Sequence, residues 1–561
     1  MQFSILTAVY QPVPDHLCEC LASVDRQSWT SFEHVVVDDG SADPAVYEML
    51  DNGAARWRAV HHRPTNGGIV AASNDALDRA TGEWVVLLDH DDVLADEALG
   101  SLARAISRNP TADVIYSDHD IIRPDGRLAD PVYKPDFSPE RLRQTNYITH
   151  LVAVRREALI AVGGFRAGTD GAQDHDLLLR LMERGTPFVH VPEVLLHWRQ
   201  SPASVAADTA NKPEAFDRGR DVVASHLERV GIAADVEPGA HDGIYRIRRR
   251  PRDDEDDQVD QLVSVVIPTR GSSGAVWGVD RVFVTDAVAS IAERSSHRAL
   301  EFVVVADAAT PQGVLDRLAV IADESHVELR CLVFDEPFNF SRKINLGVAA
   351  AAADVVLLLN DDTELIEPTS IATMLSLLGE SSHLSGTIGE VGAVGAKLLY
   401  GDGTLQHGGH VYHGEFMHAC IGWRGDNPGP QRMFAIEREC AGVTAAALMT
   451  TRDVFDRAGG FPEDLPLHFN DVDFCVSVRE LGHRILFTPH ASWYHFEGKS
   501  RSRGATMHEW TRVANRWADG IPHDPYANPN LMPKRADWLE LPGRSGAPPY
   551  YFDGGGPKRW S

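Results

Sequence analysis

Acidic residues stand directly after apolar runs of the sequence, where they could bind a metal ion if the fold brings them together. Asp39 follows the run EHVVVD, and Asp89 and Asp91 follow EWVVLL. In an open α/β sheet the ends of parallel strands share one edge, so we expect these carboxylates to lie together. Like charges at such an edge raise one another's pKa values unless a cation or hydrogen-bond donors satisfy them. Carboxylate oxygens favour hard cations, so the pattern predicts a Mg²⁺ or Mn²⁺ site that could also neutralise a diphosphate.

The elements that must position these acids occur twice along the chain. FSILTAVY at 3–10 and VSVVIPTR at 263–270 are apolar runs typical of parallel strands covered on both faces. Strand-like and helix-like segments then follow in the same order, and the offset between matched positions grows without reversing. This predicts two copies of one α/β domain with a doubly wound, mostly parallel sheet. The second copy places three polar residues at the matching strand ends: Asp307, Asn360 and Asp362.

Changes in composition suggest the domain boundaries. We expect the first domain at 1–205 and the second at 262–505. Between them, 206–261 combine a helical pattern with the run YRIRRRPRDDEDDQ, whose opposite charge blocks are typical of a solvated linker. Residues 506–561 are rich in Pro, Gly and aromatic residues, which indicates a short C-terminal extension.

Composition argues against several classes of protein. The 561 residues suggest about two to four domains. With 53 Lys and Arg against 81 Asp and Glu, the net charge of −28 leaves no general basic surface, so no nucleic-acid partner is expected. Six cysteines are too few for a disulfide framework and fit a reducing cytosol. We expect a cytoplasmic chain without secretion signal or membrane span, because neither pattern occurs.

Short motifs follow one another in a matching order in the two halves. The first copy has SILTAVY, VVVDDGS, LLDHDD, GGF, QDHDLLLRL and HWR. The second has SVVIPT, FNFSRKIN, LLLNDDTEL, GGFPEDL, FNDVDF and WYHFEGKSR. In the order of these motifs, both halves resemble family 2 glycosyltransferases of the GT-A fold. The resemblance covers about 3–200 and 262–505, and the tandem arrangement is similar to that of bacterial transferases for O-antigen, rhamnan or other cell-surface polysaccharides.

The resemblance implies roles for the strand-end residues. Asp39 and Asp307 match the acid that recognises the nucleotide base of the donor. The D-x-D motif, which holds metal and diphosphate, comprises Asp89 and Asp91 in the first copy and Asn360 and Asp362 in the second. The second copy departs from the pattern, because Asn360 is a neutral ligand and the position of Asp38 is taken by Ala306.

The resemblance also implies a catalytic base in each copy, Asp174 in AQDHDL and Asp471 in FNDVDF. An acceptor hydroxyl is a poor nucleophile at neutral pH, and a carboxylate can remove its proton during attack on the anomeric carbon. Asp176 and Asp473 are the alternative bases. Either member of each pair could instead be an acid that complements a helix dipole.

Histidines and basic residues follow each base in the sequence. His197 and His495 come at nearly equal spacing after Asp174 and Asp471, and the resemblance implies contact with metal or diphosphate. A single histidine in an apolar strand is otherwise typical of a core residue. Arg199, Lys499 and Arg501 could contact phosphate or acceptor, and a solvated surface position is an equal alternative.

We interpret two further motifs as structural features and not as ligand sites. Histidines 407, 410, 413 and 418 could suggest a metal site, but their spacing follows no regular ligand pattern, so we interpret them as part of an acceptor loop. The GGF sequences at 163–165 and 459–461 are predicted turns that bring the base segment towards the donor edge.

These observations predict a bifunctional, inverting, metal-dependent glycosyltransferase. The implied donor is a nucleotide-diphosphate sugar such as dTDP-rhamnose or a UDP-hexose, and the implied acceptor is a growing glycan or a lipid-linked oligosaccharide. A lipid-linked acceptor would place the protein peripherally at the inner face of the cytoplasmic membrane. One alternative is that a single copy is active and the other binds the acceptor. A nucleotidyltransferase would need a Gly-rich basic loop after the first strand, where this chain has VYQPVPDH.

Overall fold

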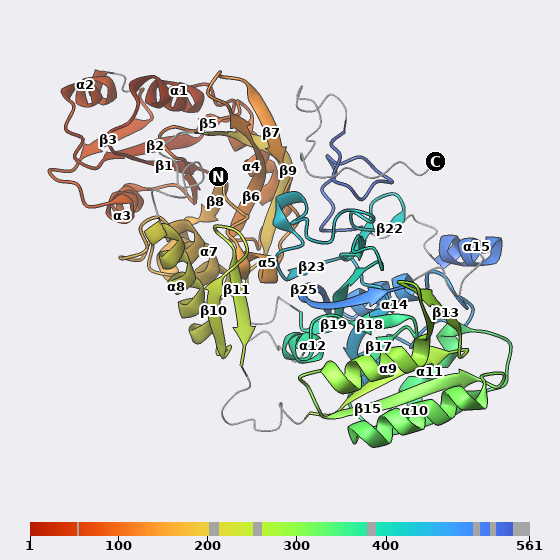
Figure 1. The fold of residues 1–561 in the computed structure, drawn as a ribbon. Helices are drawn as coiled ribbons and strands as arrows, with labels where there is room; N and C mark the ends of the chain where they lie inside the picture. Colours follow the sequence, from red (N-terminus) through yellow and green to blue (C-terminus); the bar gives the residue numbers. More distant parts are fainter. Residues whose placement is uncertain are drawn as a thin grey trace.

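The computed structural model describes residues 1–52, 55–200, 213–250, 261–378, 389–496, 505–516 and 523–541. Two large sheets lie in separate halves of the molecule, as the red-to-yellow and green-to-blue parts of Figure 1 show. Within the described ranges, no helix combines the length and apolar character needed to cross a bilayer.

The first sheet has nine strands in the order β3-β2-β1-β4-β8-β6-β9-β5, with β7 paired to β6. Strands β3, β2, β1 and β4 run parallel, whereas β8 is antiparallel to both of its neighbours. Val9 of β1 pairs with Asp38, so Asp39 follows at the end of the paired segment. The strands are β1 (Phe3–Val9), β2 (Phe32–Asp38), β3 (Arg58–His62), β4 (Trp84–Leu87), β5 (Val93–Leu94), β6 (Val114–Ile122), β7 (Leu128–Val132), β8 (Val152–Arg155) and β9 (Phe188–Arg199).

The second sheet has ten strands and repeats this order as β16-β15-β12-β17-β24-β19-β25-β18, with β20 and β23 at its sides. The predicted fold class is therefore confirmed: both copies have mixed α/β architecture with the same strand order. The strands are β12 (Val263–Thr269), β15 (Leu300–Asp307), β16 (Glu328–Phe334), β17 (Val355–Leu359), β18 (Thr363–Leu365), β19 (Val391–Leu399), β20 (Leu405–His407), β23 (Arg438–Glu439), β24 (Ala447–Thr451) and β25 (Arg484–His495).

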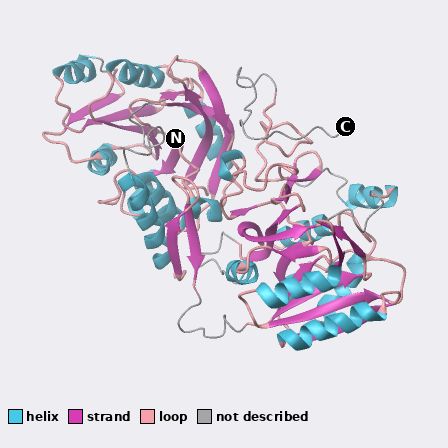
Figure 2. Cartoon of the chain, viewed as in Figure 1, coloured by secondary structure: helices cyan, strands magenta, loops and turns pink. Residues whose placement is uncertain are grey.

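Three separate hairpins and fifteen α-helices complete the described structure, and the helices flank the strands of both sheets (Figure 2). The hairpins are β10 (Ala234–Pro238) with β11 (Tyr245–Arg249), β13 (Ser273–Val276) with β14 (Val279–Val282), and β21 (His410–Tyr412) with β22 (Phe416–His418). The first half contains α1 (Pro14–Asp25), α2 (Pro44–Asn52), α3 (Ile69–Arg79), α4 (Ala98–Arg108), α5 (Pro139–Gln144), α6 (Arg156–Ala161), α7 (Gln173–Met182) and α8 (Pro213–Arg229). The second contains α9 (Phe283–Arg294), α10 (Gln312–Ser325), α11 (Phe340–Ala350), α12 (Ser370–Leu378), the 3₁₀ turn η1 (Pro430–Arg432), α13 (Arg452–Arg457), α14 (Asn470–Glu480) and α15 (Met507–Arg516).

The apolar cores explain why the strands are continuous hydrophobic runs. Successive side chains of a strand point to opposite faces of its sheet. In β4, Trp84 and Val86 belong to one buried cluster and Val85 to another. In β12, Val265 and Val266 are divided in the same way between two clusters. Both faces of each sheet are therefore covered, as expected for parallel strands.

The duplication extends to single hydrogen bonds. Asn74 in α3 donates to the Phe165 carbonyl at 2.8 Å and accepts from the Phe165 amide at 2.9 Å. Asn345 in α11 makes the same pair of bonds to Phe461, both at 2.9 Å. The two predicted GGF turns are present, with Gly164 and Gly460 both at a φ of +66°. A side-chain amide thus fastens this turn to the preceding helix in each copy.

The segment between the two sheets differs in part from the predicted linker. Helix α8 and the β10–β11 hairpin pack on the first domain, where Val222, Leu227 and Ile247 join its core. Arg249 is buried beside Glu140 and Glu437, so the first part of the charged run is not solvated. The alternation of Tyr245 and Ile247 with charged residues explains this outcome, because it gives β11 one apolar face. Residues 251–260 lie outside the described part.

A buried charge network joins the two domains. Glu140 of α5 lies 2.8 Å from Arg249, 3.4 Å from Arg484 of the second domain and in contact with Arg143. Arg484 also binds Glu439 at 2.6 Å. Burial alone would raise the pKa of Glu140, but the three guanidinium groups outweigh it and lower the pKa to about 2. The network therefore depends on an ionised Glu140 where the domains meet.

We expect Glu140→Gln to lower the midpoint of thermal unfolding, measured by calorimetry. Removing one partner of a buried charge network costs about 3–5 kcal/mol, because the remaining charges stay buried. The pKa of Glu140 is lowered by folding, so its stabilisation is present above the unfolded value of about 4.3 and is lost as the pH falls towards about 2. Glu48→Gln, at an exposed position of α2, should change stability by no more than about 0.5 kcal/mol. Equal shifts for the two variants would contradict this role for Glu140.

Candidate functional site

Asp39 is buried at the end of β2 and binds the loop that precedes α3. Its carboxylate accepts from the amides of Gly67 at 2.9 Å and Gly68 at 2.8 Å, and from Arg63 at 3.0 Å. Gly68 has a φ of +87°, which glycine adopts without strain. The acid predicted to read the donor base is thus held at the expected edge, and it already has a cationic partner.

The D-x-D segment of the first copy gathers a group of possible metal ligands. Ligand atoms of Asp89, Asp92 and His150 all lie within 4.8 Å of one another. Asp92 is buried, and its Oδ2 has no hydrogen-bond partner in the described part of the chain. Desolvation, followed by the charge of Asp89, raises the pKa of Asp92 well above its usual value. An orphaned buried carboxylate oxygen between two other ligands fits a divalent cation.

Asp174, the predicted base, faces the same group from the first turn of α7. Asp89, Asp92, His150 and Asp174 line one narrow cavity of about 40 Å³. Burial, followed by the charge of Asp89, raises the pKa of Asp174 to about 7. A carboxylate with this pKa is a stronger proton acceptor than a solvated aspartate and can act as a general base near neutral pH.

Asp176, the alternative base, has a structural environment. It is buried, and its carboxylate pairs with Arg166 at 2.5 Å and Arg180 at 2.7 Å. These pairs tie α7 to the turn before it, because Arg180 also donates to the carbonyl of Gly164. The geometry therefore favours Asp174 over Asp176 as the base.

His197 and Arg199 on β9 line a different hollow from Asp174. His197 Nδ1 lies 2.5 Å from Asp120 Oδ1. Arg199 donates from Nε to the carbonyl of Asp91 at 2.9 Å and contacts Glu19. Neither residue belongs to the Asp89 group, and Arg199 instead braces the D-x-D loop through its backbone. Asp91, the predicted metal ligand, is also outside that group.

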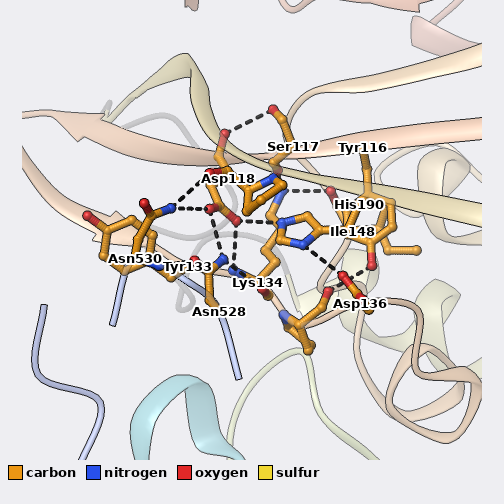
Figure 3. A network of polar contacts seen from close by, with 12 residues as sticks. Tyr116, Ser117, Asp118, Tyr133, Lys134, Asp136, Ile148, His190, Asn528 and Asn530 are labelled. Carbon is orange, nitrogen blue, oxygen red and sulfur yellow. Dashed lines mark hydrogen bonds and ion pairs between the residues drawn. The ribbon is translucent and has the colours of Figure 1, made fainter. Parts of the chain in front are cut away.

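A buried polar network, drawn in Figure 3, holds the segment that carries His150. Lys134 Nζ donates to the carbonyls of Ser117, Ile148 and His150 at 2.6 to 2.7 Å. Asp118 accepts from the Lys134 amide and contacts His190, both at 2.8 Å. Burial lowers the pKa of Lys134 to about 7. The side chain of Lys134 thus fixes the backbone on which His150 stands.

The C-terminal extension closes this network from the other end of the chain. Asn528 donates to Asp118 and to the Lys134 carbonyl, each at 2.9 Å, and Asn530 donates to the Pro192 carbonyl at 2.9 Å. Figure 3 shows both asparagines beside Asp118. Part of the predicted extension therefore belongs to the support of the first site.

In the second copy, Asp307 binds a buried lysine. Lys343 Nζ lies 2.7 Å from Asp307 and donates to the Thr269 carbonyl at 2.6 Å. Burial lowers the pKa of Lys343, although Asp307 opposes this effect. Lys343 stands in the FNFSRKIN motif within α11, whereas Arg63, which pairs with Asp39 in the first copy, stands in the loop before α3. Each predicted base-reading acid thus has one cationic partner.

The N-x-D segment of the second copy contacts His495, the histidine for which the resemblance implies contact with metal or diphosphate. His495 Nε2 lies 3.0 Å from Asp362 Oδ1 and 3.1 Å from Asn360 Nδ2, and Nδ1 lies 2.7 Å from Gln406. Asn360 is buried, and within the described residues its Oδ1 has no partner. This amide oxygen, Asp362 and His495 form a donor set that fits a divalent cation with one fewer carboxylate than the first copy offers.

Asp471 faces this set across a larger cavity. The cavity of about 210 Å³ is lined by Asn360, His495 and Asp471 together with residues of the β21–β22 hairpin. Asp471 accepts from the Ala445 amide at 3.3 Å. Asp473, the alternative base, pairs with Arg516 of α15 at 2.6 Å and is buried. The second copy therefore repeats the division between a predicted base that faces the cavity and an acid that is ion-paired. Lys499 and Arg501 lie outside the described residues.

Comparison with known proteins identifies the family of the chain. The family described as Glycosyl transferase family 2 matches residues 4–164, and the family described as Glycosyltransferase like family 2 matches 261–520. The chain belongs to the family 2 glycosyltransferases. The GT-A fold implied by the resemblance is thus the fold of both domains of this family 2 chain.

Two relatives align with nearly the whole length of this chain. The uncharacterized protein y4gI of Sinorhizobium fredii (strain NBRC 101917 / NGR234) is 34% identical over 556 residues, which are 96% of this chain and 58% of that protein. The O-antigen biosynthesis protein RfbC of Myxococcus xanthus is 30% identical over 540 residues, which are 94% of this chain and 40% of that protein. This family 2 chain thus spans about half the length of these relatives.

Solved structures are more distant. The mannosyltransferase PcManGT from Pyrobaculum calidifontis, in complex with GDP-Man and Mn²⁺, is 22% identical with a TM-score of 0.31, covering 41% of this chain and 63% of that chain. TarS 1–349 of S. aureus, in complex with UDP-GlcNAc, is 20% identical with a TM-score of 0.34, covering 40% and 66%.

Sequence reasoning missed several residues of this glycosyltransferase's sites. His150 and Lys134 belong to no quoted motif, and only the fold brings them to the D-x-D segment. The sequence contains only a weak indication of Arg63 and Lys343. Arg63 is a basic residue shortly before the helix that carries Asn74, and Lys343 is a basic residue within the helix that carries Asn345. Asp92 is the last residue of the quoted LLDHDD motif, although the resemblance assigns it no role of its own.

An experiment can decide whether His150 or His197 is the metal ligand of the first copy. In a chain that also carries Asp362→Ala, which weakens the second site, we expect His150→Ala to reduce Mn²⁺ affinity about 10-fold or more. The reason is that His150, and not His197, lies within ligand distance of Asp89 and Asp92. Isothermal titration calorimetry measures the affinity, and His197→Ala in the same background is the matched control. A larger loss for His197→Ala would show that the ligand is His197.

Proposed function

We propose that the chain carries two glycosyltransferase sites, each of which transfers a sugar with inversion from a nucleotide-diphosphate donor to a growing surface glycan. One observation carries this proposal. In both copies, a carboxylate on the first turn of a helix faces a strand-end group of possible cation ligands across a cavity. These carboxylates, Asp174 and Asp471, occupy the position that the family resemblance assigns to the base.

The base makes the acceptor hydroxyl nucleophilic. Asp174 or Asp471 accepts the hydroxyl proton as the oxygen attacks the anomeric carbon of the donor sugar. The bond to the diphosphate oxygen breaks on the opposite side, so one displacement inverts the configuration. The raised pKa of Asp174, about 7, suits this task because the conjugate acid holds the proton more firmly than a solvated aspartic acid would.

The strand-end residues supply the donor end of each site. Asp89, Asp92 and His150 would hold a cation in the first copy, and Asn360, Asp362 and His495 in the second. A bound Mn²⁺ or Mg²⁺ would supply positive charge that stabilises the diphosphate leaving group. Asp39 and Asp307 would bind the nucleotide base, in competition with their contacts to Arg63 and Lys343.

The acceptor belongs to the same proposal. The relative named O-antigen biosynthesis protein RfbC supports a surface polysaccharide. The donor in this proposal is dTDP-rhamnose or a UDP-hexose, as the family resemblance implies. A lipid-linked acceptor would bring the protein to the inner face of the cytoplasmic membrane. Two sites in one chain would then add two sugars in sequence or form two alternating linkages.

The variants Asp174→Asn and Asp471→Asn test the proposal. Each removes one base while keeping the size of the side chain, so each should slow the formation of one linkage about 100-fold or more. The measurement is product analysis by mass spectrometry, after a screen of nucleotide sugars with and without Mn²⁺ has identified the donor.

Each variant is the control for the other, because the untouched domain should keep its activity. If Asp471→Asn loses no linkage, the second copy is an acceptor-binding module and the first domain alone is catalytic. Loss of both linkages in either variant would contradict two independent sites.

A further inference from the structure

Three histidines that follow one another in the second copy meet in space. His407 ends β20, while His410 and His418 stand on β21 and β22. Their ligand nitrogens lie within 4.8 Å of one another. The ring centroids are 4.9 to 5.1 Å apart, and the ring planes are nearly perpendicular, at 80 to 89°. Three imidazoles therefore surround one point, an arrangement that their irregular spacing in the sequence did not indicate.

The backbone explains how these rings converge. His410 and His418 are direct partners in the antiparallel β21–β22 hairpin, which brings their side chains to one face. Gly409, whose φ is +96°, lies in the turn between His407 and His410, and this turn brings His407 to the same face. The Cβ of any other residue at Gly409 would lie only 3.2 Å from Arg438 and Cys440. The hairpin and this turn together place the third ring.

The surroundings of the rings limit their movement. His407 and His410 are buried. Neighbouring groups orient the rings: His410 Nδ1 lies 3.3 Å from the Tyr412 hydroxyl, and His407 Nε2 accepts from the Thr444 amide at 3.3 Å.

We infer that His407, His410 and His418 form a binding site for a transition-metal ion of the Zn²⁺ class. Three imidazole nitrogens are a donor set that Zn²⁺ accepts with a fourth position open, whereas Mg²⁺ and Mn²⁺ favour carboxylate oxygens. The site is distinct from the Asn360, Asp362 and His495 group. It lies in the wall of the same cavity, because His410 and His418 line it beside Asp471.

One contact must change when the ion binds. His407 Nδ1 and His418 Nδ1 are 2.8 Å apart and share a proton, which the ion replaces. A neutral His407 bound through Nδ1 carries its proton on Nε2, so the long contact from the Thr444 amide opens. The adjacent amide, that of Ala445, donates to Asp471. Occupation of the site is therefore linked through one loop to the predicted base of the second copy.

The test uses the full chain without a polyhistidine tag, in a buffer with millimolar Mg²⁺ that occupies the carboxylate groups. Plasma mass spectrometry measures zinc per chain, and titration with Co²⁺ reports a four-coordinate nitrogen site through its visible absorption. We expect one equivalent to bind. His418→Gln should weaken binding about 100-fold or more, since a direct ligand should matter at least as much as a supporting residue.

His413→Gln is the matched control. His413 lies in the turn between β21 and β22 and contacts the Leu531 carbonyl, outside the three-histidine group. It should keep full binding, and His410→Gln should repeat the loss seen with His418→Gln. Metal-free unfolding midpoints of all three variants show whether each one folds. The inference is overturned if the folded wild-type chain binds no Zn²⁺ or Co²⁺, or if His413→Gln loses as much affinity as His418→Gln.

Discussion

Mutual repulsion among acids at the ends of parallel strands is the constraint on which both sites depend. The segment that leaves β4 at one edge of the sheet carries Asp89, Asp91 and Asp92, and burial of Asp92 removes the water that would screen its charge. Desolvation, followed by the charge of Asp89, raises the pKa of Asp92 well above its usual value. A folded chain can hold such a group only with donors, cations or protons nearby. The arrangement of each site follows from how this charge is compensated.

The two copies use different compensation on the same scaffold. In the first, Asp92 keeps an orphaned oxygen and Asp174 takes up a raised pKa. In the second, Asn360 replaces one carboxylate, and His495 lies against Asp362. Fewer negative charges reduce the attraction for a cation, while a histidine that already contacts Asp362 must exchange partners when a cation enters. The shared strand order therefore does not require equal metal affinity.

The sequence predicted what depends on local pattern and failed where distant segments meet. Buried parallel strands require continuous apolar runs, so the duplication and the α/β sheet could be inferred. Asp174 and Asp471 came instead from the family resemblance, and both line cavities. His150 could not, because its place beside Asp89 depends on Lys134, which binds its carbonyl, and on Asn528 from the far end of the chain. Arg249 looked like part of a solvated run for a similar reason. Its partners, Glu140 and Glu437, come from two different domains.

The buried contacts between the domains bear on how two sites could work on one glycan. Arg484 lies at the start of β25, the strand that ends in His495, and Arg484 binds both Glu140 and Glu439. On the other side, the segment with Asn528 supports the strands around Asp118 in the first domain. Each domain thus contributes structure to the support of the other's site. Separating the domains would expose these charges, so the two cavities are held in one relative placement. Under the proposed function, a growing acceptor would have to span the two cavities or move between them.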